Sequence, residues 1–130
     1  MTSTVVRAAA FGAPIPNFLA DRNLGAPLAH IPHLYYCDPI EGKDPLGRDV
    51  APDFRVDISG ALETKVAMLS AHASQREWLL KHHGIDHYVN AMRDWCAKRG
   101  KEMNVGYAEG FRQHLGHSYP QDNLLGELLR

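Results

Sequence analysis

The stretch that decides the fold is F-R-V-D-I-S-G-A-L-E-T-K-V-A-M-L-S-A-H-A-S-Q, residues 54–75. Its first five residues alternate apolar and polar side chains, which is the period of a half-buried strand. The part that follows repeats apolar side chains at helical spacing, at Leu62, Val66, Leu69 and Ala73. The sequence therefore predicts a strand over residues 54–58 and a long helix over residues 59–83.

The expected long helix has recognisable ends. Asp57 or Ser59 can cap its N-terminus, because short polar side chains accept hydrogen bonds from the first free backbone N–H groups of a helix. Gly84 follows its last turn and can end it.

Five further elements complete the expected order along the chain. They are a helix over residues 4–11, a strand over 34–38, a helix over 86–99 that Gly100 ends at its C′ position, a strand over 103–111 and a short helix from Leu124 onward. A loop rich in Pro and Gly separates the first two. This mixture predicts an α/β or α+β layering rather than a helical bundle or a β-barrel.

Length and composition limit the class of protein. The 130 residues suffice for one domain with a modest core, and 45% hydrophobic with 22% charged residues is typical of globular chains. A net charge of −1 provides no basic surface for nucleic acid or a membrane, and no apolar run is long enough to span a bilayer. Two cysteines without CxxC spacing, and the lack of a signal sequence, predict a cytoplasmic protein.

Eight histidines raise the question of a metal site. His30 and His33 form an H-x-x-H pair, but the proline between them excludes an ordinary helix that would place both rings on one face. His82, His83 and His87 cluster around a helix end, where the helix dipole already accounts for the first two. Because zinc requires three or four convergent ligands, we predict a metal site at neither group.

Two polar pairs are candidate site residues. His72 and Gln75 lie three positions apart on the long helix and share a face with Met68, where they either brace a loop or contact a polar ligand. Tyr107 and Glu109 lie two positions apart on one face of the last strand, which suits recognition of hydroxyl groups or a hydrogen bond to an arginine such as Arg112. From spacing alone, a purely structural role accounts for each pair.

The order and separation of these segments resemble a known family. F-R-V-D-I, L-E-T-K-V-A-M-L-S-A-H-A-S-Q and Y-A-E-G-F are similar to the C-terminal half of the LmbE-like, or PIG-L, de-N-acetylases. The resemblance implies a partial Rossmann-like α/β fold and the zinc-dependent removal of acetyl groups from N-acetylglucosamine-type sugars. It also implies that Tyr107, Glu109, His72 and Gln75 form the substrate-binding side of the pocket.

The chain departs from this family where the family binds zinc. The motifs A-H-P-D-D-E and H-x-D-H are both missing, so we expect no metal ligand and no catalytic residue in this chain alone. T-S-T-V-V-R-A-A-A, residues 2–10, resembles the helix that follows the last ligand. On this view Met1 is an internal methionine, and residues 1–130 form one incomplete LmbE-like domain.

Two functions stay open. In the first, the chain is the C-terminal fragment of a de-N-acetylase, inactive until a complementing N-terminal half supplies the metal site. In the second, it is a non-catalytic α/β module for carbohydrate binding or assembly. Half of a layered sheet should expose apolar surface at Leu34 and Tyr36, so we expect association with the complementing half or with a second copy.

Overall fold

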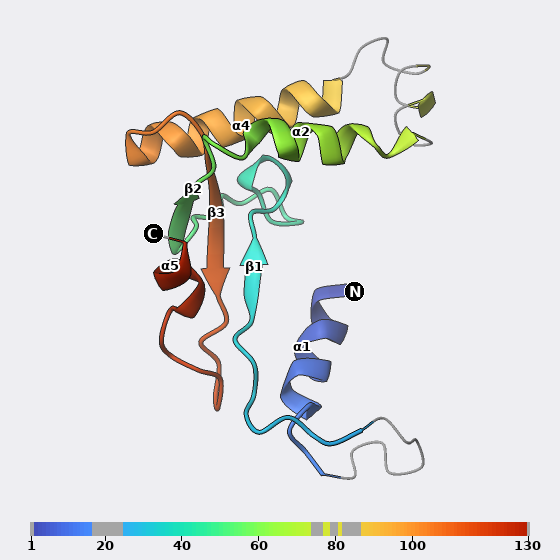
Figure 1. The fold of residues 1–130 in the computed structure, drawn as a ribbon, viewed down its shortest axis with the longest axis vertical. Coiled ribbons are helices and arrows are strands. Elements are labelled where there is room, and N and C mark those ends of the chain that lie inside the picture. The colour runs from blue at the N-terminus through green and yellow to red at the C-terminus, as the bar shows by residue number, and fades with distance from the viewer. Residues whose placement is uncertain (1, 17–24, 74–76, 79–80, 82–86, 130) are drawn as a thin grey trace.

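The computed structural model describes residues 2–16, 25–73, 77–78, 81 and 87–129. Helices surround one small sheet, which confirms the mixed helix-and-strand class (Figure 1). The elements in chain order are α1 (Thr2–Gly12), β1 (Tyr35–Cys37), the 3-10 turn η1 (Ile40–Gly42), β2 (Phe54–Asp57), α2 (Leu62–Ser70), α4 (His87–Met103), β3 (Ala108–Gln113) and α5 (Leu124–Leu128).

The sheet is antiparallel and places the last strand of the sequence in its centre. The strand order is β1–β3–β2, with Tyr36 opposite Arg112 and Val56 opposite Glu109. The strands predicted over 34–38 and 54–58 are confirmed to within a residue at each end. The described strands contain no parallel pair, so they do not confirm the Rossmann-like arrangement.

Helices α2 and α4 run side by side across one end of the sheet (Figure 1), and α4 contacts both β3 and β2. Between these layers lies a small core of apolar side chains. Its buried members are Val56, Leu62, Val89, Cys96 and Ala108, and Tyr119 is buried at the C-terminal side. The core is modest, as the length of the chain predicts.

Helix α2 begins later than the sequence predicts. Ala61 occupies the N-cap position and makes no capping hydrogen bond through its side chain. The carboxylate of Asp57 instead accepts the backbone N–H of Ser59 at 2.8 Å and its hydroxyl at 2.6 Å. The predicted capping role is therefore wrong, because Asp57 and Ser59 close a turn that precedes the helix.

The C-terminal end of α2 also differs from the prediction. Ala71 is the C-cap residue, and the N–H of His72 donates to the carbonyl of Leu69 at 3.2 Å, three residues back. Helix α2 therefore ends at Ser70, and the single helix predicted over 59–83 is interrupted at residues 71–72. Beyond this break the described residues 73, 77–78 and 81 are helical again, and the rest of the predicted span lies outside the described residues.

Helix α4 continues through Gly100 instead of ending there, which also delays the start of β3 to Ala108. Its end is set by Asn104, whose φ of 60° is left-handed. The N–H of Val105 bonds to the carbonyl of Gly100 at 3.0 Å, and that of Asn104 bonds to the carbonyl of Lys101 at 3.3 Å. These two bonds form the Schellman arrangement, with asparagine in the position that we expected glycine to take.

The helices near the chain ends were both predicted. Helix α1 contacts the C-terminal segment, because the hydroxyl of Tyr119 donates to the carbonyl of Arg7 at 2.8 Å and its ring lies 6.3 Å from that of Phe11. The side chain of Asn123 caps α5 by accepting the N–H of Gly126 at 3.0 Å. None of the described helices is long and apolar enough to cross a membrane.

Candidate functional site

A groove with a volume of about 550 Å³ lies where α2, α4 and the first residues of β3 meet. Its lining is mostly apolar and contains a few polar side chains of different chemistry. The residues that line it are Ile58, Ala61, Thr64, Lys65, Met68, Leu69, His72, Met92 and Glu109. This combination suits a ligand that carries both polar and apolar groups.

Helix α2 supplies four of these residues on one face, namely Thr64, Lys65, Met68 and Leu69. Ala61, its N-cap residue, and His72, which follows its end, add to the lining. Of the apolar stripe that the sequence predicts, Leu69 lines the groove, whereas Leu62 is buried in the core with 3% of its surface exposed. The core face and the groove face of the helix are therefore neighbours.

Two of the four predicted site residues meet in the groove. His72 follows the end of α2 and Glu109 lies on β3, and both line it. Tyr107 is not among the lining residues, and its backbone N–H donates to the hydroxyl of Ser59 at 3.1 Å. Gln75 lies outside the described residues.

Lys65 is the site residue that the sequence argument missed. Its ammonium group forms an ion pair with the carboxylate of Glu109 and lies 3.3 Å from the sulfur of Cys96. Lys65, rather than Arg112, is thus the partner of Glu109 among the described residues. The sequence signal that could have identified Lys65 is its spacing from His72. The two residues are seven positions apart, about two turns, on the helix that the sequence predicts.

The ion pair stabilises the charged form of Lys65. Partial burial lowers the pKa of its ammonium group, but the hydrogen bond and charge of Glu109, helped by Cys96, outweigh this effect and raise the pKa above its ordinary value. Lys65 is therefore a cation at neutral pH and donates hydrogen bonds, and it has no lone pair with which to act as a base.

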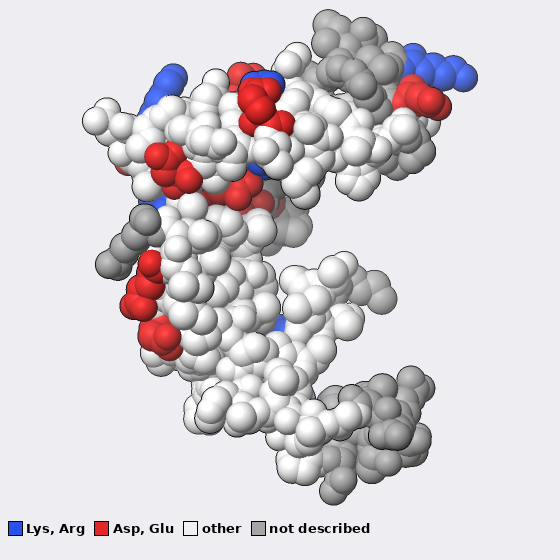
Figure 2. All heavy atoms as spheres, in the orientation of Figure 1, with Lys and Arg blue, Asp and Glu red and all other residues white. Residues whose placement is uncertain are grey.

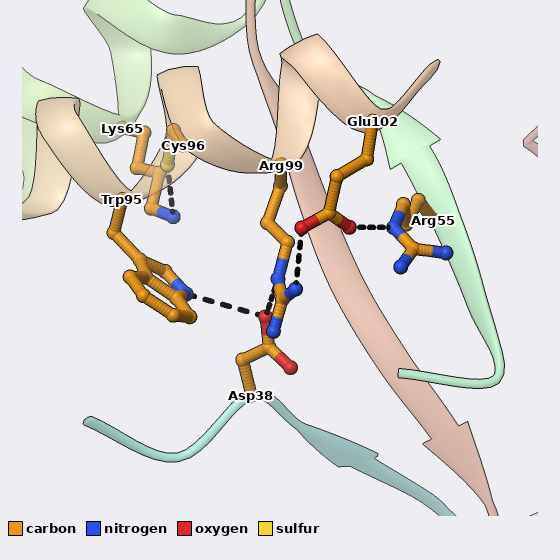
Figure 3. Close-up of polar contacts among 7 residues, drawn as sticks. All are labelled: Asp38, Arg55, Lys65, Trp95, Cys96, Arg99 and Glu102. Carbon is orange, nitrogen blue, oxygen red and sulfur yellow. Dashed lines mark hydrogen bonds and ion pairs between the residues drawn. The ribbon is translucent and has the colours of Figure 1, made fainter. Parts of the chain in front are cut away.

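A second cluster, formed by Asp38, Trp95, Arg99 and Glu102, fixes α4 to the sheet (Figure 3). One oxygen of Asp38 accepts Nε of Arg99 at 2.6 Å and the indole N–H of Trp95 at 3.2 Å, and Arg99 also donates to Glu102 at 2.8 Å. Only 9% of the Asp38 side chain and 7% of the Arg99 side chain are exposed. The cluster thereby holds the helix that carries Met92 into the groove.

The described residues contain no group of three or more His, Cys, Asp or Glu side chains that could hold a metal ion. His30 is exposed, and Nε2 of His33 is hydrogen-bonded to Asp122 at 2.9 Å. His82 and His83 lie outside the described part of the chain. Among the residues that the structure describes, the zinc that the family resemblance implies therefore has no fitting ligand set.

Comparison with known proteins gives the fold a precedent. No family model matches the chain, and no curated protein matches it. In fold it is similar to the crystal structure of GalB, the 4-carboxy-2-hydroxymuconate hydratase from Pseudomonas putida KT2440, with a TM-score of 0.54 and 20% sequence identity. The match covers 94% of this chain and 47% of that one, so the chain spans about half the length of the structure that it matches.

Proposed function

We propose that the groove is the substrate-binding wall of a metal-dependent hydrolase that removes acetyl groups from N-acetylglucosamine-type sugars. The observation that carries the proposal is the convergence of His72 and Glu109 with Lys65 in one groove. The family resemblance implies that the first two of these residues contact the substrate. Their meeting across two separate elements supports a binding role for both.

The chemistry of the groove fits an acetylated amino sugar. Lys65 donates hydrogen bonds and Glu109 accepts them, so together they satisfy both kinds of sugar hydroxyl contact. The side chains of Met68, Leu69 and Met92 provide an apolar surface for the methyl of an acetyl group. Binding of the intact sugar therefore requires both sides of the groove.

We further propose that the metal ligands and parallel strands of a Rossmann-like domain come from a complementing segment, and that the protein works in the cytoplasm. The half-length match to a larger solved chain supports the first point. The two free thiols of Cys37 and Cys96 fit a reducing compartment and support the second. In this arrangement the described chain binds and orients the sugar and performs no chemical step alone.

Binding measured by calorimetry tests the proposal on the chain as it is. We expect methyl N-acetylglucosaminide to bind and its deacetylated counterpart to bind more weakly. Glu109→Gln and Lys65→Met should each raise the Kd by about fivefold or more, since each removes a charged hydrogen-bonding partner. Glu63→Gln is the matched control. Glu63 lies on α2, pairs with Arg93 of α4 and does not line the groove.

Two results would contradict this function. The first is equal affinity of the Glu109→Gln and Glu63→Gln variants for the sugar. The second is a clear preference for a polycarboxylate over the sugar, which would favour a ligand like the carboxylated muconate named for GalB. Lys65 makes the second comparison informative, because an ammonium group can also bind a carboxylate.

A further inference from the structure

We infer that the ligand of the groove is an amphiphile, an N-acetylated amino sugar linked to an uncharged aliphatic or aromatic group. This inference rests on the proposed function and specifies what the sugar carries. It excludes as preferred ligands both a free sugar and a sugar joined to a strongly anionic group.

The apolar wall is larger than an acetyl methyl group requires. Ile58, Met68, Leu69 and Met92 approach the groove from three segments, so an apolar surface extends along it. Met68 is 68% exposed, which leaves an unbranched apolar side chain in water at the groove. A ligand that covers this surface gains affinity in proportion to the apolar area removed from water.

The kind of side chain also favours a variable apolar group. Two of the four large apolar residues are methionines, whose flexible and polarisable thioethers adapt to ligands of different shape. The volume of about 550 Å³ falls within the range of small-molecule sites, which allows a sugar and an attached chain to bind together.

The charges of the groove explain why the attached group should be uncharged. Among the described residues that line the groove, Lys65 is the one ammonium or guanidinium group, and Glu109 already pairs with it. An anionic group would have to compete with that carboxylate for the same cation. A neutral chain on the apolar wall leaves the ion pair intact for the sugar hydroxyl groups.

Calorimetry with matched glycosides tests the inference. We expect octyl N-acetylglucosaminide, below its critical micelle concentration, to have a Kd at least about tenfold lower than the methyl glycoside. Met68→Ser should reduce this ratio to about twofold or less, because it removes apolar wall from an exposed position. Met103→Ser is the control, since Met103 is exposed on α4 and does not line the groove, and it should keep the full ratio.

Each remaining outcome has a distinct meaning. Equal affinity for the octyl and methyl glycosides overturns the inference and leaves the proposed function standing. Octyl glucoside, which lacks the acetamido group, should bind more weakly than octyl N-acetylglucosaminide, and equal binding of the two would also overturn the inference. Binding of neither N-acetyl glycoside would refute the proposed function, and the inference with it.

Discussion

At the scale of single residues, two ion pairs of different burial show how this chain uses charge. Asp38 and Arg99 are almost fully buried and share a hydrogen-bonded cluster (Figure 3), whereas Lys65 and Glu109 are each about one-third exposed, at 34%, in the groove. A buried pair depends on both partners being present, because a single remaining charge is costly in the interior. The first pair is therefore structural, and the second is available to a ligand.

Removal of Arg99 should be far more damaging than removal of another arginine on the same helix. Arg99→Met leaves Asp38 buried without its cation, and we expect a loss of about 3–5 kcal/mol in the free energy of unfolding. Arg93→Met breaks the exposed bidentate pair with Glu63 and should cost far less stability, because solvent screens an exposed ion pair. Urea denaturation of both variants measures the difference, and Arg99→Lys, which keeps the charge, should retain part of the stability. Equal losses for the two methionine variants would contradict a structural role for the cluster.

Stability should also depend on Glu102 in acid. Burial raises the pKa of its carboxyl group, but hydrogen bonds and charges from Arg55 and Arg99 outweigh burial and lower the pKa below its ordinary value. A carboxylate whose pKa is lowered by folding stabilises the native state above its unfolded pKa, and this stability is lost as pH falls through the folded value. Between about pH 5 and pH 3, the free energy of unfolding should therefore fall less steeply in Glu102→Gln than in the wild-type chain. If the free energy of unfolding falls equally steeply with pH in the two proteins, Glu102 does not contribute to the acid dependence of stability.

At the scale of elements, Gly100 reveals why α4 continues past its expected end. A Cβ at this position would lie 2.6 Å from the carbonyl oxygen of Gly106 and 2.8 Å from the nitrogen of Tyr107. Glycine is thus required by the close approach of the segment that leads into β3, and the helix turns into that segment only at Asn104.

Gly100→Ala should consequently destabilise the protein, although alanine normally favours a helix by about 1 kcal/mol over glycine. The contacts are with backbone atoms that have little freedom to move, so we expect a net loss of about 1–3 kcal/mol, as for other overpacked sites. Gly60→Ala is the control, because a Cβ there has no atom within 4 Å. Thermal unfolding of both variants measures the effect, and stabilisation by Gly100→Ala would rule out this packing argument.

Local patterns predicted the elements better than their ends or their partners. Alternation at 54–58 and the leucine pattern after Pro120 identified β2 and α5, because these signals depend on neighbouring residues. The antiparallel order with β3 in the centre depends on pairings between distant segments, which no local period encodes. Lys65 was missed for the same reason, since its partner Glu109 lies 44 positions further along the chain.

At the scale of the whole molecule, the described residues include more exposed large apolar side chains than buried ones. Uncharged side chains cover most of the face over the sheet and α1, whereas acidic side chains gather over α2 and α4 and near α5 (Figure 2). We expected Leu34 and Tyr36 to be exposed, and both side chains are only partly exposed. The exposed large apolar side chains lie mainly on the helices and loops, and include Val5, Phe11, Leu46, Met68 and Leu128.

In the absence of a complementing segment, we expect these surfaces to drive self-association. Light scattering during gel filtration should give a mass above the 14.5 kDa of one chain, increasing with concentration. Val5→Asp, on the exposed face of α1, should reduce association more than Leu46→Asp, because Leu46 is a single exposed side chain in a loop. A monomer at all concentrations, with one sharp unfolding transition, would contradict the expectation.

The central claim is that the groove between α2, α4 and β3 binds an N-acetylated amino sugar, and the methionine methyl groups test it most directly. Met68 and Met92 line the groove and Met103 does not. One sample with isotope-labelled methionine methyl groups therefore contains two probes of the groove and one control. In a nuclear magnetic resonance titration with methyl N-acetylglucosaminide, we predict saturable shifts of the Met68 and Met92 methyl signals and a constant Met103 signal. Unchanged groove signals at saturating sugar, or equal shifts at Met103, would contradict the account.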